Sequence, residues 1–301
     1  MMHLAPGALA GSYTPVITPF RDGEVDQGVY EALVERQIVG GSQGVVVNGT
    51  TGEPSTLTAE ERADLVRVAV RCSGGRVPVV AATGSQSHAE TVWLCERAVA
   101  DGADALLVVT PYYVRPPQRG LVEYFVDLCR RSDLPLLAYH IPGRAAVTME
   151  AVTLEAISER AENFVGMKHA SSDLALVSEA LLRLGQEFRI FVGLEELSYP
   201  MLALGASGLM NAVANLVPER VAALWHAVEE GRLADARKLH FDLWGLNRAI
   251  FWDTNPIPIK YMLARMGVLE RNEHRLPMVP AAPDVQARLD AVLEQAGLTL
   301  T

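Results

Sequence analysis

Short apolar runs recur along the chain, and each is followed by a longer segment whose apolar residues have helical spacing. Eight such runs occur, and most are continuous rather than alternating, as in parallel strands that are buried on both faces. This alternation of strand and helix predicts an α/β fold, and its number favours a (β/α)8 TIM barrel. The runs cover residues 13–18, 44–48, 77–82, 105–109, 135–139, 164–168, 189–192 and 207–210.

Capping patterns mark the expected starts of helices. Thr58 is followed three positions later by Glu61, which predicts a capping box, and Ser87 with Glu90 repeats the pattern. The alternative fold, an open dinucleotide-binding sheet, would need a GxGxxG motif after the first strand. Residues 15–22 carry no such motif, so we favour the closed barrel.

After the eighth run the pattern becomes purely helical. We expect residues 1–217 to form the barrel and residues 218–301 to form a C-terminal helical extension. No linker rich in Gly, Ser or Pro separates the two, so both should belong to one structural unit. The helical segments expected in this extension are 218–230, 233–251, 256–266 and 283–295.

Composition narrows the class of protein. Half of the residues are hydrophobic, which suits a large core, and no apolar run approaches the ~20 residues of a membrane helix. The net charge of −10 disfavours nucleic acid and anionic membranes as partners. Three cysteines without metal-binding spacing, and no recognisable signal peptide, favour a reduced, cytoplasmic protein. The scattered histidines do not support a metal site.

The sixth apolar run ends on Lys168, one of only three lysines in the chain. Burial makes a charged ammonium group costly, so a lysine at this place is expected to have a readily accessible neutral form. A neutral amine in a pocket can attack a carbonyl carbon. The alternative is a lysine that simply ends the strand and reaches solvent, and the run alone leaves both interpretations open.

Other strand ends add candidate chemistry, because the loops that follow the strands of a barrel build its active site. Residues 48–53 place two threonines between two glycines, which suits a carboxylate or phosphate oxygen, although an ordinary tight turn has the same composition. Tyr139 could move protons beside a neutral lysine. Arg144 could bind a carboxylate, or could form a surface ion pair. Glu195 and Glu196, near the seventh strand, would repel a phosphate.

These strand ends resemble the family of dihydrodipicolinate synthase and N-acetylneuraminate lyase over nearly the whole chain. The members of that family are pyruvate-dependent class I aldolases, built on a (β/α)8 barrel with a C-terminal helical extension. Four motifs at matching separations make the resemblance specific. They are Gly-Thr-Thr-Gly-Glu from Gly49, Thr-Pro-Tyr-Tyr from Thr110, Tyr-x-x-Pro-x-Arg from Tyr139 and Gly-Met-Lys from Gly166.

The resemblance implies a role for each matching residue. Lys168 would form a Schiff base with pyruvate, and Tyr139 would be the adjacent general acid and base, so that neither a metal nor an organic cofactor is needed. Thr51 and Tyr113 would complete a proton relay, with Tyr113 reaching in from a neighbouring subunit. The implied partners are pyruvate, an aldehyde and further copies of the chain in a dimer or a dimer of dimers. The implied substrate-binding residues are Gly49, Thr50, Arg144, Gly193 and Met210.

Three positions depart from the synthase pattern. His140 follows the tyrosine where the synthase usually has Asn, and His169 follows the lysine where it has Glu. Glu195 stands where the synthase typically has Asp. We expect these residues near the second-substrate pocket, where they would influence the choice of aldehyde.

The site at which feedback-inhibited synthases bind lysine is also altered. Pro54, Ala59 and Arg62 replace its usual residues, although Gln86 and Glu90 still resemble it. The resemblance therefore disfavours inhibition by lysine.

Three functions remain open from the sequence. The leading one is 4-hydroxy-tetrahydrodipicolinate (dihydrodipicolinate) synthase of lysine biosynthesis, condensing pyruvate with aspartate semialdehyde, because Arg144 suits an acceptor that carries a carboxylate. The second is a catabolic pyruvate aldolase that cleaves a 4-hydroxy-2-oxo acid, a dicarboxylate or a sugar acid. The third is a catalytically silent barrel that binds keto acids, and the intact set of candidate residues argues against it.

Overall fold

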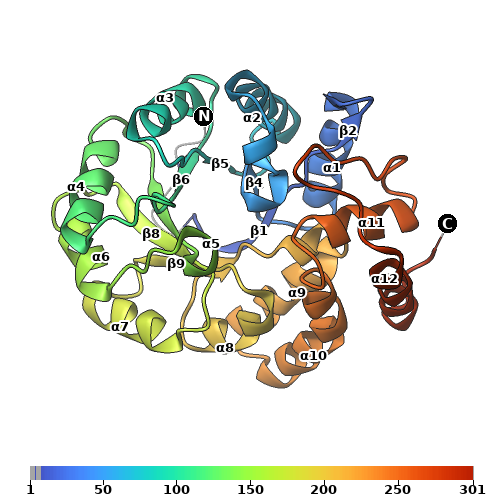
Figure 1. Ribbon diagram of the computed structural model, residues 1–301. Coiled ribbons are helices and arrows are strands. Elements are labelled where there is room, and N and C mark those ends of the chain that lie inside the picture. Colours follow the sequence, from blue (N-terminus) through green and yellow to red (C-terminus); the bar gives the residue numbers. More distant parts are fainter. Residues whose placement is uncertain (1–3, 5–7, 301) are drawn as a thin grey trace.

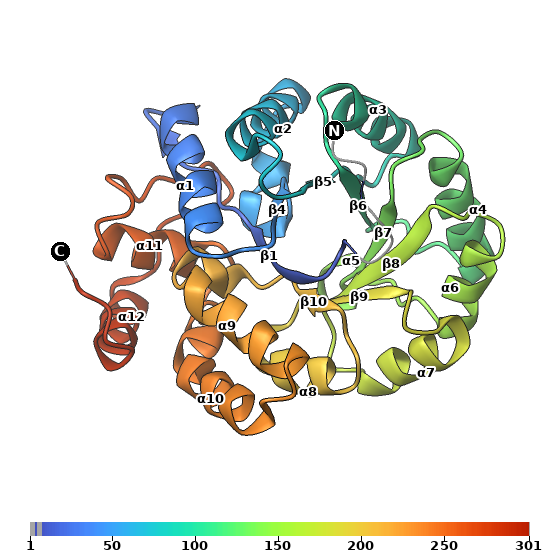
Figure 2. The same cartoon turned by 180° about the vertical axis from the view of Figure 1, so that it is seen from behind.

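The computed structural model describes Leu4 and residues 8–300, and its parallel strands close into a barrel surrounded by helices (Figures 1 and 2). This confirms the predicted (β/α)8 TIM barrel. Around the barrel the strands follow the order β1-β10-β9-β8-β7-β6-β5-β4. Their bounds are β1 Gly11–Pro15, β4 Gly44–Val47, β5 Val79–Ala82, β6 Ala105–Val109, β7 Leu136–His140, β8 Phe164–His169, β9 Arg189–Val192 and β10 Gly208–Leu209.

The helices form the outer ring and the C-terminal part of the molecule. In chain order the longer ones are α1 Gln27–Val39, α2 Ala59–Ser73, α3 His88–Ala100, α4 Gln118–Cys129, α6 Ala151–Ser158, α7 Leu174–Leu184, α9 Pro218–Glu229, α10 Leu233–Ala249, α11 Ile257–Arg265 and α12 Pro283–Gln295. Short elements follow several strands, namely η1 Thr50–Gly52, η2 Pro54–Thr56, α5 Pro142–Ala145, η3 Glu195–Leu197, α8 Ser198–Ala203 and η4 Ala212–Asn215.

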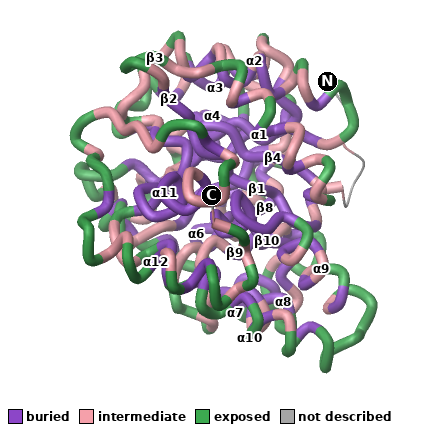
Figure 3. The backbone as a smooth tube through the Cα atoms, turned by 90° about the vertical axis from the view of Figure 1, so that its right-hand side faces the viewer, coloured by how far each residue is buried: buried purple, intermediate pink, exposed green. Residues whose placement is uncertain are grey.

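The strands are continuous apolar runs because both of their faces are buried. The buried positions lie at the centre of the molecule and the exposed ones along its outer turns (Figure 3). One inner layer is made by side chains such as Tyr13, Val46, Leu107 and Phe191, with the rings of Tyr13 and Phe191 in edge-to-face contact at 5.0 Å. The barrel interior is therefore a packed core, open only towards its ends.

Two local features differ from the sequence-based expectation. Residues 20–25 form a small antiparallel hairpin, β2 Phe20–Arg21 and β3 Glu24–Val25, which the apolar pattern did not indicate. Its two-residue loop, Asp22 and Gly23, has positive φ at both positions, as a tight hairpin turn requires. A hairpin this short carries too few side chains to show a strand period.

The capping patterns were half confirmed. Thr58 and Glu61 form the complete capping box at the start of α2. At α3 the Ser87 hydroxyl accepts from the Glu90 N–H, but the Glu90 carboxylate accepts from the hydroxyl of Ser85 rather than returning to Ser87. A nearer hydroxyl competes with the backbone N–H of the cap, and the sequence pattern alone does not show it.

The C-terminal helices start with one that completes the barrel. α9 packs against β1 and β10 and is the eighth helix of the ring, while α10 packs on α9, and α12 packs on α10 and α11 (Figure 1). The expected boundary at residue 217 therefore separates α9 from the barrel to which it belongs. The true extension is α10, α11 and α12, and α11 returns to contact η4 near the carboxyl ends of the strands.

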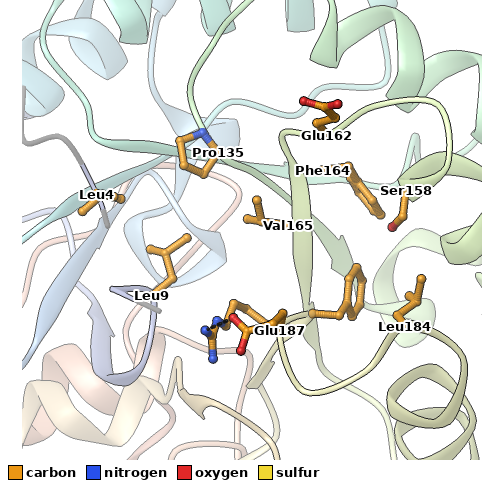
Figure 4. A pocket seen from close by; sticks show the side chains of 11 residues that line it. Leu4, Leu9, Pro135, Ser158, Glu162, Phe164, Val165, Leu184 and Glu187 are labelled. Carbon is orange, nitrogen blue, oxygen red and sulfur yellow. Dashed lines mark hydrogen bonds and ion pairs between the residues drawn. The ribbon is translucent and has the colours of Figure 1, made fainter. Parts of the chain in front are cut away.

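The barrel has a cavity at each end. The cavity at the amino ends of β7, β8 and β9 measures about 470 Å³ and is lined mainly by apolar side chains, with Leu9 and Val165 pointing into it (Figure 4). At its edge, Glu187 and Arg189 form an ion pair of 2.9 Å. The cavity at the carboxyl ends, next to α5, contains the candidate chemistry.

Candidate active site

Lys168 and Tyr139 lie side by side at the carboxyl ends of two neighbouring strands. β7 and β8 pair in register with Tyr139 opposite Lys168, and Lys168 Nζ lies 4.5 Å from the centre of the Tyr139 ring. Lys168 is only 4% exposed. The lysine therefore does not run out to solvent, which leaves the interpretation of a buried amine beside a phenol.

A glycine keeps the space beside the lysine open. A Cβ on Gly193 would lie 2.7 Å from Lys168 Cε, closer than carbon atoms approach, so any other residue there would displace the lysine side chain. Met210, from the end of β10, is buried in the same inner layer as Tyr139. Gly193 thus lies against Lys168, whereas neither Gly193 nor Met210 lines the adjoining cavity.

The turn after β4 brings its hydroxyl groups to this pair. Asn48 adopts positive φ and directs the chain into η1, so that Thr50 Oγ1 donates to Tyr139 Oη over 3.4 Å. Thr51 instead accepts a hydrogen bond of 3.0 Å from Asn255 Nδ2. Within one chain, therefore, the hydroxyl that contacts Tyr139 is that of Thr50. The expected relay through Thr51 is not seen, because the Thr51 hydroxyl is bonded to Asn255. Adjacent residues of a tight turn point in different directions, and the sequence does not indicate which of two threonines faces the tyrosine.

A cavity of about 290 Å³ opens beside Tyr139 and Thr50. Gly49, Glu53 and Arg144 also line it, so polar groups converge on an otherwise largely apolar pocket, as in small-molecule sites. Arg144 lies in α5, and its Nη2 donates to the backbone oxygen of Asn255 at 3.5 Å. The predicted substrate-binding residues Gly49, Thr50 and Arg144 thus line the same cavity.

Tyr113 does not reach this cavity in its own chain. It is 86% exposed and has a φ of 71°, on the loop that follows β6, whereas the preceding Tyr112 lines the cavity. A bulky residue with a left-handed backbone and an exposed ring is an unusual combination. The expectation that Tyr113 enters the site of a neighbouring subunit is compatible with this exposure and remains a prediction.

The three residues that depart from the synthase pattern lie outside the cavity. His140 and His169 directly follow the two inward-facing residues, and successive side chains of a strand point to opposite faces. Glu195 is buried at the start of η3, where its carboxylate accepts the backbone N–H of Ala212, and burial raises its pKa to about 7. An influence of these residues on the aldehyde would therefore have to be indirect.

Sequence reasoning missed an ion pair that supports the Thr50–Thr51 turn. Lys260 Nζ on α11 lies 2.9 Å from Glu53 Oε1, and both side chains are completely buried. Lys260 also lies over the ring of Phe20, at 4.4 Å from its centre. Burial raises the pKa of Glu53 and lowers that of Lys260, and their mutual attraction opposes both shifts. The scarcity of lysine was a signal, but the partners are 207 positions apart.

Together, Glu53 and Thr51 connect the turn to the C-terminal extension. Lys260 holds the first and Asn255 holds the second, and both come from the segment at the start of α11. The extension is therefore the outer support of the turn that lines the cavity.

Within the described part of the chain, no cluster of three or more His, Cys, Asp or Glu side chains has the arrangement of a metal site. In the same residues no helix is both long enough and apolar enough to cross a membrane.

Comparison with known proteins agrees with the geometry of the site. The model of the dihydrodipicolinate synthetase family matches residues 8–296. The chain belongs to this family. A 4-hydroxy-tetrahydrodipicolinate synthase of Thermus thermophilus is 46% identical over 289 residues, covering 96% of each chain. Another from Nitratidesulfovibrio vulgaris (strain Miyazaki F) is 41% identical over 96% of this chain and 98% of that relative.

Solved structures give the same result for the fold. The crystal structure of dihydrodipicolinate synthase from Aquifex aeolicus superposes with a TM-score of 0.95 at 38% identity, covering 97% of this chain and 100% of the other. The family consists of lyases of the class I aldolase type, and this chain is one of them. The silent keto-acid-binding barrel is thereby set aside.

Proposed function

We propose that this enzyme condenses pyruvate with aspartate semialdehyde to form 4-hydroxy-tetrahydrodipicolinate, with Lys168 as the residue that carries pyruvate. The observation that carries the proposal is the register of β7 and β8, which sets the buried amine of Lys168 against the phenol of Tyr139, and Tyr139 lines the cavity. The names of the full-length relatives support the same reaction. Such a step would belong to the synthesis of lysine.

The chemistry follows from the buried amine. Lys168 Nζ attacks the keto carbon of pyruvate, the resulting carbinolamine loses water, and a protonated imine forms. This imine withdraws electrons from the adjacent methyl group, which loses a proton and becomes an enamine nucleophile. The enamine carbon then forms a bond to the aldehyde carbon, whose oxygen takes up a proton. The amino group brought in by aspartate semialdehyde attacks the imine carbon, and cleavage of the bond from that carbon to Lys168 Nζ closes the ring and frees the lysine amine. The imine is the electron sink, so this route uses no metal or organic cofactor.

Tyr139 is placed to move the protons of these steps. Its hydroxyl accepts from Thr50 over 3.4 Å, which leaves the phenolic proton directed away from Thr50 and available on the cavity side. The carbinolamine must gain a proton on its hydroxyl to leave as water, and a positioned phenol can supply it. Thr50 orients the phenol and can replace the proton that it gives away.

The carboxylates of the two substrates have separate candidate partners around the cavity. The turn Gly49–Thr51 opens η1 and offers backbone N–H groups and a hydroxyl to the carboxylate of pyruvate. Arg144 lines the other part of the cavity and is steadied by the backbone oxygen of Asn255. A guanidinium there suits the carboxylate of aspartate semialdehyde, because it can form two parallel hydrogen bonds with it.

We further propose that the active unit is at least a dimer. Tyr113 is exposed on the loop beside the cavity mouth, next to Tyr112, which lines the cavity. In a dimer with this loop at its interface, the exposed ring would enter the partner's site and extend the Thr50–Tyr139 pair. Sedimentation of the wild-type protein and of Tyr113→Ala, with activity measured at the same concentrations, tests this assembly. A monomer with full activity would contradict it.

Borohydride trapping tests the reaction class. The protein is incubated with pyruvate and sodium borohydride, and peptide mass spectrometry locates the reduced adduct. We expect the mass increase on the peptide that contains Lys168, and none on those with Lys238 or Lys260. A folded protein that gains no mass would overturn the proposal.

An aldehyde panel tests the second substrate. Consumption of pyruvate is followed with aspartate semialdehyde, with succinic semialdehyde and with an uncharged aldehyde of similar length. We expect the highest kcat/KM for aspartate semialdehyde. In Arg144→Leu, kcat/KM should fall for the two aldehydes that carry a carboxylate and stay nearly unchanged for the uncharged one. Faster cleavage of a 4-hydroxy-2-oxo acid than condensation of any of these would instead favour a catabolic aldolase.

A further inference from the structure

Behind the reacting pair, two histidines are in contact. His140 and His169 are register partners at the last position of β7 and β8, with Nδ1 atoms 3.0 Å apart and ring centres 5.1 Å apart. Both are buried, with exposed fractions of 1% and 0%. Because the strand alternates its side chains, they lie on the outer face of the barrel wall, directly behind Tyr139 and Lys168.

The surrounding groups determine which nitrogen carries each proton. His169 Nε2 lies 3.1 Å from the backbone oxygen of Asp173, which can only accept, so this nitrogen is the N–H. The Nδ1 of neutral His169 is then an acceptor, and His140 Nδ1–H is the donor to it. The remaining nitrogen, His140 Nε2, is left as a bare lone pair, and this buried nitrogen has no hydrogen-bond partner among the described residues. The bonds form one directed chain from β7 through β8 to the start of α7.

A further proton on either ring would be unfavourable. On His169 Nδ1 it would face the N–H of His140, and on His140 Nε2 it would be a buried donor without a partner. The charged group that faces the rings is the carboxylate of Asp173, which caps α7 by accepting from Leu176 N–H and favours the protonated forms. Burial outweighs it, lowering the pKa of His140 to about 4 and lowering that of His169.

We propose that His140 and His169 are positioning residues, a neutral imidazole pair that fixes the separation of β7 and β8 where these strands present Tyr139 and Lys168. The inference rests on the roles proposed above for those two residues. The backbone bonds at this level run from Ala170 N to His140 O at 2.9 Å and from Gly193 N to His169 O at 2.8 Å. The imidazole pair adds the bond between side chains, at the last rung of the ladder.

This position predicts which kinetic constant depends on the pair. Proton transfer between Lys168, the substrate and Tyr139 requires a defined separation, and a misplacement of ~1 Å can cost about a hundredfold in rate. The carboxylate of pyruvate is assigned to the turn after β4, which the histidines do not contact. Loss of the pair should therefore lower kcat and leave the KM for pyruvate nearly unchanged.

Nitrogen NMR tests the tautomers without reference to any substrate. Protein with ¹⁵N-labelled histidine is compared with His140→Asn and His169→Asn to assign the two rings. We expect His140 as the Nδ1–H tautomer, His169 as the Nε2–H tautomer, and both neutral at pH 6. A charged ring at pH 6, or two Nε2–H tautomers, would overturn the assignment of the pair.

Kinetics test the positioning role. We expect His140→Asn and His169→Asn each to lower kcat by roughly tenfold, and the double variant to be no slower than the slower single one, because both remove the same bond. The double variant H140N/H169E, which can restore a hydrogen bond across the strands, should recover most of kcat. His240→Asn, which changes another buried histidine, on α10, is the matched control and should keep its rate.

The outcomes separate this inference from the proposed function. Unchanged kcat in both single variants, additive losses, or a changed preference among aldehydes would overturn positioning by the pair. If a single variant does not fold, H140N/H169E replaces it in the comparison. A kcat of this double variant that stays well below the wild-type value would also overturn positioning by the pair. Failure of borohydride trapping in the wild-type protein would overturn the proposed function and leave the tautomer result standing.

Discussion

The two ends of the barrel hold cavities of different size and different chemistry. The larger, about 470 Å³, lies at the amino ends of the strands, and the smaller, about 290 Å³, lies at the carboxyl ends. Apolar side chains line most of the larger cavity, with Ser158, Glu162 and the ion pair of Glu187 and Arg189 beside them. The smaller is lined by Tyr139, Thr50 and Arg144 together with apolar side chains. Volume therefore does not indicate the active site. What distinguishes the carboxyl ends is that Tyr139, which lines the smaller cavity with Thr50 and Arg144, also lies against the buried amine of Lys168.

The difference has a physical basis in strand direction. All the barrel strands are parallel, so their carboxyl ends meet at one rim, and each can contribute a side chain there without disturbing the packing below. The amino ends are occupied by side chains such as Phe164 and Phe188, whose rings are 5.9 Å apart and close the core. Changes at the carboxyl ends should thus affect rate, and changes at the amino ends should affect stability.

The largest effect is expected for Lys168→Arg. A guanidinium stays protonated and cannot form the imine, so turnover and borohydride trapping should both disappear while the fold is kept. Lys238→Arg, on the exposed surface of α10, is the matched control and should retain full activity. Normal turnover of Lys168→Arg would end the distinction between the two ends of the barrel, since no other residue at the carboxyl ends is assigned the imine.

Tyr139→Phe should have the next largest effect. Removal of the phenolic hydroxyl should lower kcat by ~10²–10⁴, the usual contribution of general acid–base catalysis. Steady-state rates with pyruvate and the preferred aldehyde measure it, and thermal unfolding checks that the packing of the ring is preserved. An unchanged rate would remove Tyr139 from the mechanism and assign the proton transfers to another group.

Phe188→Ala tests the opposite end. Deletion of this buried ring should lower the free energy of unfolding by about 3–5 kcal/mol, because it leaves a cavity in the core. Under conditions where the variant is folded, kcat should match that of the wild type. Denaturant unfolding measures the loss of stability, and steady-state kinetics on the same preparation measure any loss of kcat. A selective loss of kcat would show that the amino ends also contribute to the reaction.

The smallest effect concerns the pH dependence of stability through Glu195. Its folded-state pKa of about 7 lies above the ordinary value of 4.5, so the protonated form stabilises the fold. This contribution is complete below pH 4.5 and is lost as the pH rises through about 7. Glu195→Gln should therefore flatten the decline in the free energy of unfolding between these pH values, by on the order of 3 kcal/mol at the upper end. An identical pH profile for the variant and the wild type would contradict the raised pKa.

The sequence predicted a large part of the fold and the central residues of the site. Continuous apolar runs and helical spacing are local signals, repeated eight times, so errors at single boundaries did not change the architecture. Lys168 and Tyr139 could be selected because each ends an apolar run, and motif spacing placed them in a known family. Two features escaped such local signals. The β2–β3 hairpin is too short to show a strand period, and the cap at Ser87 is incomplete because the nearby hydroxyl of Ser85 binds the Glu90 carboxylate.

Other features depended on contacts that the sequence does not display. Both threonines of the turn were candidates, and the left-handed backbone at Asn48 decided that Thr50 faces Tyr139. His140 and His169 were expected near the second substrate, but strand alternation turns them to the other side of the wall. Such orientations follow from the local backbone only once the strand register is known.

By itself, then, the sequence determined the barrel and the family and selected Lys168 and Tyr139 as the candidate amine and phenol, because periodicity and motif spacing are properties of neighbouring residues. Only the tertiary structure decided that Lys260 holds Glu53 across 207 positions, that Asn255 holds Thr51, and that the two histidines meet behind the site. These pairings arise when the barrel closes and the last helices return to its rim. Their partners are distant in the chain, and no local pattern connects them.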